Sequence, residues 1–117
     1  MITTKEIAKL AVNAADQKNG ADILVLDVDR LTTIADYFVI CSGTSSPQIK
    51  AIADEIERAL IEAGETPIHI EGYFDANWIL MDYGSVVVHI FRQETREFYS
   101  LEHLWADAPV FKPADMK

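Results

Sequence analysis

Three aspartates have the residue type and spacing of a metal-dependent transferase site. Asp27 and Asp29 stand two positions apart in an apolar run, so their side chains would point to one side of a strand. Together with Asp82 on a neighbouring strand, they could bind Mg²⁺ for nucleotidyl or phosphoryl transfer. That class of enzyme places a Gly-Ser element before its Asp-x-Asp strand, whereas residues 43–45 follow it here. This order disfavours a catalytic metal, and a Mg²⁺-dependent transferase is kept as the alternative function.

The other reactive side chains do not form a catalytic set. The histidines His69, His89 and His103 are far apart in the chain and have no ligand spacing. His89 lies in an apolar run, which favours a hydrogen-bonded core or interface histidine. Cys41 also lies in an apolar run, where a thiol is inert. We therefore expect a protein that is not an enzyme and has no catalytic residue, metal or cofactor.

Residues 43–47 form a Gly-Thr-Ser-Ser-Pro turn between a predicted strand and a predicted helix. Backbone N–H groups at such a position can bind an anion. The turn lacks the lysine of a phosphate-binding loop and the spacing of a dinucleotide fingerprint. We interpret it as a structural turn, with Ser46 as the helix cap, Pro47 as the first helical residue and Gly64 as the stop signal.

The elements that position these residues follow from the hydrophobic pattern. Thr3 and Glu6 have the spacing of a capping box, and apolar residues recur behind them at helical intervals as far as Gly20. A second helix follows Ser46. The predicted strands cover residues 23–28, 37–41, 67–71, 77–83 and 85–92; residues 94–97 are expected to be a turn and residues 100–105 a short helix. This order predicts an α/β fold, a mixed five-stranded sheet with flanking helices.

Length and charge limit the classes of function. The 117 residues suffice for one domain, predicted over 1–108, with a tail at 109–117 that has little to pack and is expected to be flexible. The formal net charge of −9 disfavours nucleic acid as a direct ligand. No apolar run is long enough to span a membrane, and the start of the chain resembles neither a signal nor a transit peptide. We expect a cytoplasmic protein without membrane contact.

Negative charge and aromatic residues coincide in one segment. Residues 59–91 contain no Lys or Arg, and they carry Glu62, Glu65, Glu71, Asp75 and Asp82. In the predicted strand 77–83, large apolar side chains alternate on both faces. The pattern indicates either a strand buried on both faces or an aromatic surface for a basic partner.

Four blocks of sequence resemble the ribosomal silencing factor family, also called Iojap-like. These blocks are residues 35–46, 78–84, 86–91 and 96–105, and their order and spacing match the family over nearly the whole chain. The resemblance implies a fold with nucleotidyltransferase-like architecture and no known catalysis. It also implies translation regulation: a repressor that binds the large ribosomal subunit through its fourteenth protein and blocks joining of the small subunit when nutrients are scarce.

The resemblance further implies which residues meet the partner. The expected partner-binding residues are Trp78, Met81, Asp82, Tyr83, Tyr99, Leu101 and Trp105. The family often forms homodimers, and a strand that is apolar on both faces would allow one here. For so acidic a chain, we expect contact with a basic ribosomal protein and little direct contact with nucleic acid.

Overall fold

The first helix begins at the predicted capping box. α1 (Thr4–Gln17) follows Thr3, whose hydroxyl accepts a hydrogen bond from the Glu6 amide at 3.1 Å. The Glu6 carboxylate accepts in return from the Thr3 amide at 3.3 Å, which confirms the prediction. The computed structural model describes residues 2–116, so Met1 of the predicted domain and Lys117 of the predicted tail lie outside the described residues.

The second helix begins one residue earlier than predicted. α2 (Ser46–Glu62) is capped by Ser45, whose hydroxyl accepts from the Gln48 amide at 3.2 Å. Ser46, the predicted cap, is the first helical residue, and its hydroxyl accepts from the Arg92 guanidinium at 2.6 Å. The predicted stop is confirmed: Gly64, just past the helix, has a φ of 91°, a conformation that glycine adopts without strain.

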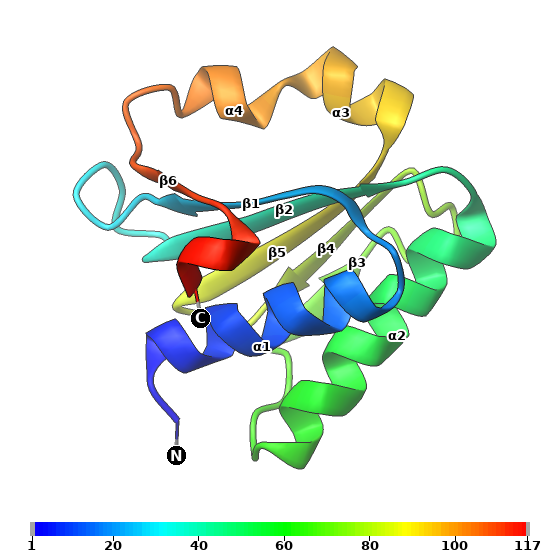
Figure 1. Cartoon of the computed structure of the whole chain (residues 1–117), viewed down its shortest axis with the longest axis horizontal. Helices are drawn as coiled ribbons and strands as arrows, with labels where there is room; N and C mark the ends of the chain where they lie inside the picture. The colour runs from blue at the N-terminus through cyan, green and yellow to red at the C-terminus, as the bar shows by residue number, and fades with distance from the viewer. Residues whose placement is uncertain (1, 117) are drawn as a thin grey trace.

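The sheet has six strands and not the five that were predicted, in the order β3-β4-β5-β2-β1-β6 (Figure 1). The bounds of the strands are Ala21–Asp27 (β1), Tyr37–Gly43 (β2), His69–Glu71 (β3), Trp78–Asp82 (β4), Val86–Arg92 (β5) and Val110–Phe111 (β6). β2 and β5 are parallel, and the other neighbouring pairs are antiparallel. The sheet is therefore mixed, as predicted.

The sixth strand corrects the expectation that the tail has little to pack. β6 pairs antiparallel with β1, with Leu26 opposite Val110 and Val25 opposite Phe111. The 3-10 helix η1 (Pro113–Met116) follows, and Met116 is buried. The backbone groups on the open edge of β1 provide the pairing, and two residues are too few to show a strand period in the sequence.

The helices lie on both faces of the sheet. α1 and α2 cover one face, while α3 (Gln93–Tyr99) and α4 (Leu101–Leu104) lie over the other (Figure 1). The predicted turn at residues 94–97 is wrong, since these residues belong to α3. The one buried residue of α3 is Arg96, so the helix has no apolar stripe that a hydrophobic pattern could detect.

β4 separates two hydrophobic clusters. Ile79 and Met81 are fully buried on the face that α1 and α2 cover. Trp78 and Leu80 alternate with them and pack as half-buried residues on the face below α3 and α4. No helix within residues 2–116 is long and apolar enough to cross a membrane.

Candidate functional site

A continuous row of rings lies on the face of the sheet below α3 and α4. Successive ring centroids are separated by 4.9 Å between Tyr99 and Trp78, 5.9 Å between Trp78 and His89, 5.1 Å between His89 and Phe38, and 5.4 Å between Phe38 and Trp105. We call this row, together with the exposed side chains Phe98 and Leu104 of the helices above it, the aromatic face.

Trp78 is fixed at the centre of the aromatic face by His89. The indole Nε1–H donates to His89 Nδ1 at 3.1 Å, and the indole also lies 4.9 Å from the ring of Phe91. The hydrogen bond satisfies the polar end of the indole and leaves part of the ring surface accessible. Trp78 is therefore held in a fixed orientation with part of its ring accessible.

His89 is held neutral by its surroundings. It is 5% exposed, and burial lowers its pKa to about 4. Because Nδ1 accepts the hydrogen bond from Trp78, the ring proton is assigned to Nε2. Nε2 is buried and has no hydrogen-bond partner within residues 2–116. The prediction of a hydrogen-bonded core or interface histidine is confirmed, and the hydrogen bond holds the Trp78 indole in place.

The outer layer of the aromatic face is unusually accessible for apolar residues. The exposed fraction is 81% for Phe98, 51% for Tyr99 and 72% for Leu104. Trp105 is half-buried beside them. The rings of Phe98 and Tyr99 are neighbours, with centroids 5.1 Å apart, and exposed apolar side chains that lie together mark interaction sites.

The structure brings together four of the seven predicted partner-binding residues. Trp78, Tyr99 and Trp105 belong to the aromatic face, and Leu101 is buried beneath it in the same hydrophobic cluster. Met81 and Tyr83 are a correction to the predicted set. They lie on the opposite face, where Met81 is fully buried and Tyr83 is 9% exposed, so neither presents a surface to a partner.

Asp82, the seventh residue, has a structural role at the turn between β4 and β5. Its carboxylate accepts from the Gly84 amide at 2.7 Å and lies 3.8 Å from the imidazole of His69. It lies four residue steps along the strand from Trp78, a distance of about 13 Å. Asp82 therefore does not touch the aromatic face.

The segment that contains α3 and α4 is mostly acidic. Residues 93–111 carry the carboxylates Glu94, Glu97, Glu102 and Asp107 against the single cation Arg96. Arg96 is buried and forms an ion pair with Glu102 at 3.2 Å. Exposed apolar side chains on an acidic segment are complementary to a basic surface.

The three aspartates of the alternative function do not form one site. Asp82 is on β4 and Asp27 is on β1, and the strands β5 and β2 lie between them. Three strand spacings amount to about 14 Å, whereas ligands of one Mg²⁺ lie about 2 Å from the ion. Asp29 lies beside Asp36, and a hydrogen bond between the two carboxyl groups raises the pKa of Asp36. Within residues 2–116, no group of three or more possible ligands is placed to bind a metal ion.

The turn at residues 43–47 is closed by the chain itself. The side-chain oxygen of Gln48 accepts a hydrogen bond from the backbone N–H of Thr44 at 2.8 Å. The side-chain nitrogen of Gln48 donates to the Asn19 carbonyl at 3.0 Å. A Cβ at Gly43 would come within 2.8 Å of Ile49, which explains the glycine. These contacts agree with a structural turn, although the helix cap is Ser45 and not Ser46. Burial also raises the pKa of the Cys41 thiol to about 12, consistent with an inert thiol.

Four members of the aromatic face were missed by sequence reasoning: Phe38, His89, Phe98 and Leu104. The register pairs Leu80 with His89, which places both side chains on one face of the sheet. Because side chains alternate between the faces along β4 and β5, the sequence could have placed His89 on the same face as Leu80. Phe98 and Leu104 fall within the sequence block 96–105 that carries the family resemblance.

Comparisons with known proteins agree with this resemblance. A family model described as "Ribosomal silencing factor during starvation" matches residues 1–117. The ribosomal silencing factor RsfS of Bacillus subtilis is 46% identical over 106 residues, which cover 91% of this chain and 90% of the relative.

Two further matches extend the comparison. The mouse mitochondrial assembly of ribosomal large subunit protein 1 is 36% identical over 82% of this chain and 43% of its own length. A crystal structure of a Chromobacterium violaceum protein superposes with a TM-score of 0.88 at 36% identity, covering 90% of this chain and 88% of that one. The chain belongs to the ribosomal silencing factor family.

Proposed function

We propose that this protein is a non-enzymatic repressor of translation that binds the large ribosomal subunit through its fourteenth protein. Membership of the family supports a ribosome-associated regulator. The mouse relative is named for the assembly of the large subunit, which favours that subunit as the partner. The observation that carries the proposal is the indole of Trp78, which His89 orients within an exposed aromatic face.

Repression in this proposal is steric. The chain measures 33 × 32 × 26 Å, a body large enough to block a contact of the small subunit when it is bound at the subunit interface. We infer that the fold is related in architecture to nucleotidyltransferases and that it serves binding here. No cofactor takes part in this mechanism.

Charge supports a basic ribosomal protein as the direct contact. A net charge of −9 opposes close approach to rRNA, so direct contact with nucleic acid is small in this proposal. We further propose that the protein acts in the cytoplasm, as part of a stress response to scarce nutrients. The exposed apolar side chains of the aromatic face would also allow a homodimer of the free protein.

Substitution of Trp78 tests whether the aromatic face is the contact. Trp78→Ala should weaken binding to isolated large subunits by about 2 kcal/mol, or about 30-fold, because buried tryptophans dominate interface energies. Co-sedimentation measures the binding, and circular dichroism checks that the variant is folded. Phe74→Ala is the matched control, since Phe74 is 89% exposed and contacts Tyr73, outside the aromatic face. A folded Trp78→Ala variant that binds like the wild type would exclude Trp78 from the interface.

A further inference from the structure

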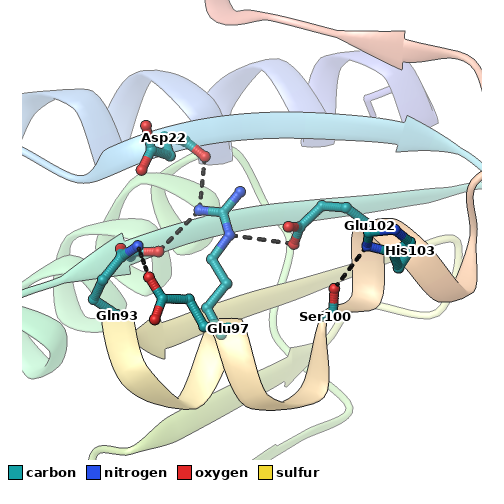
Figure 2. A network of polar contacts seen from close by, with 8 residues as sticks. Asp22, Gln93, Glu97, Ser100, Glu102 and His103 are labelled. Atoms are coloured by element: carbon teal, nitrogen blue, oxygen red, sulfur yellow. Dashed lines mark hydrogen bonds and ion pairs between the residues drawn. The ribbon is translucent and has the colours of Figure 1, made fainter.

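Arg96 is a buried arginine with one free edge. It is 6% exposed, and its guanidinium donates to the Glu102 carboxylate at 3.2 Å, the Asp22 carbonyl at 2.8 Å and the Ser42 hydroxyl at 2.9 Å. Figure 2 shows Asp22 and Glu102 at the ends of two of these contacts. The three bonds use Nε and Nη1, and a guanidinium has two further N–H donors on Nη2.

These two donors have no acceptor within residues 2–116, yet they are not sealed in the interior. The described buried side-chain atoms without a partner are Tyr83 Oη and His89 Nε2, and Arg96 Nη2 is not among them. Nη2 is therefore not completely buried, and Arg96 lines a cleft of about 710 Å³. The guanidinium, which keeps one edge without a partner, thus belongs to the wall of this cleft.

The fold fixes this edge from three elements. β1 is irregular between Ala21 and Leu24, and Asp22 has a φ of 49°, which turns its carbonyl toward Arg96. Ser42 belongs to β2 and is 1% exposed, and Glu102 belongs to α4. An arginine fixed in this way loses little conformational entropy when a ligand binds.

The other walls of the cleft show which ligand fits. Lys112 and Pro113, next to β6, and Leu24 of β1 line it, as do the carboxylate residues Asp22 and Glu97. Because Glu102 is paired with Arg96, the charges left for a ligand are the ammonium of Lys112 and the two carboxylates. A polyanion would be repelled by these carboxylates, whereas a ligand that carries both a carboxylate and an ammonium group could pair with charges of both signs in the cleft.

We propose that the cleft between α3, β1 and the β6–η1 segment binds an α-amino acid with an aliphatic side chain. The ligand carboxylate accepts from Arg96 Nη2 and from Lys112, and its ammonium group lies toward Glu97 and Asp22. Leu24 and Pro113 provide apolar contact for the side chain. This site is separate from the aromatic face, and the proposal does not depend on the proposed ribosomal function.

Titration of the full chain with matched probes tests the ligand class. The probes are L-leucine, 4-methylpentanoate without the ammonium group, 3-methylbutylamine without the carboxylate, and inorganic phosphate. Amide chemical shifts report the site, with the side-chain amide of Gln93 in the cleft as a marker. L-leucine should give saturable shifts at the cleft, and each of the other probes should bind at least tenfold more weakly. The absence of saturable shifts with leucine, or equal binding of phosphate or 4-methylpentanoate, would overturn the proposal.

Two variants assign the contacts without depending on Arg96, which the fold itself uses. Lys112→Glu should weaken leucine binding at least tenfold, and Glu97→Gln should weaken it several-fold. Lys9→Glu is the control, because Lys9 is an exposed residue of α1 outside the cleft and makes the same charge change. Its affinity should stay within twofold of the wild type. Equal affinities of the Lys112→Glu and Lys9→Glu variants would contradict the assignment.

Discussion

The hydrogen bond between Trp78 and His89 can be tested by a double-mutant cycle. The variants are Trp78→Phe and His89→Phe, which keep an aromatic ring at each position. Trp78→Phe leaves the buried Nδ1 of His89 without its donor at 3.1 Å. His89→Phe leaves the indole N–H without its acceptor. A buried polar group that loses its partner costs about 1–3 kcal/mol.

The size of the effects follows from the unequal surroundings of the two residues. His89→Phe also removes the buried Nε2–H, which has no partner in the described chain, and this offsets part of the loss. We therefore expect the free energy of unfolding to fall more for Trp78→Phe than for His89→Phe. The double variant removes both polar groups, so its loss should be smaller than the sum of the single losses by about 1–2 kcal/mol.

Urea denaturation of the wild type and the three variants measures this coupling. A control cycle combines Trp78→Phe with Ile52→Val, since Ile52 is buried on the other face of the sheet, and should be additive within about 0.5 kcal/mol. If the losses of Trp78→Phe and His89→Phe added as closely as those of the control pair, the hydrogen bond would not orient the indole. Our account of the aromatic face would then be wrong.

Two further predictions concern pH and the loop before β4. Because burial lowers the pKa of His89 to about 4, the unfolded chain binds more protons between pH 4 and its ordinary value of about 6.5. The free energy of unfolding should therefore fall by up to about 3 kcal/mol as the pH drops through this range. Urea titrations at a series of pH values measure this fall, and the His89→Phe variant should lack it. Identical pH profiles of the wild type and the variant would contradict this assignment to His89. Gly72→Ala should destabilise by about 2 kcal/mol or more, because φ is 78° and a Cβ would lie 2.1 Å from the Trp78 carbonyl oxygen. Gly64→Ala, with a φ of 91° and an open position, should lose less in thermal unfolding, and equal losses would refute the clash.

The sequence was most informative where side-chain pattern and structure coincide. α1 and α2 carry apolar stripes and capping residues, so their positions were predictable to within a residue or two. α3 was missed because its inward residue is Arg96, which is held by hydrogen bonds to Ser42 and Asp22 and adds no apolar residue to the pattern. β6 was missed because it is held by backbone pairing with β1. Backbone pairing of two residues produces no recognisable pattern of side chains in the sequence.

The candidate site was predictable in part for the same reason. The alternation of side chains along β4 places Trp78 on the opposite face of the sheet from Met81 and Tyr83. This alternation does not predict which of the two faces the long helices cover. The structure buries Met81 under α1 and α2 and leaves Trp78 accessible beside short helices. The register between β4 and β5 brings His89 to the Trp78 indole. This register depends on the turn at Gly84 as well as on the hydrophobic pattern of the two strands.

Inhibition of subunit joining is the most direct test of the central proposal. Purified chain is added to isolated large subunits, small subunits follow, and joined particles are measured by sucrose-gradient sedimentation. The wild type should prevent joining, and Trp78→Ala should need about 30-fold more protein for the same effect. Normal joining on large subunits that visibly carry the wild-type chain would contradict the steric mechanism.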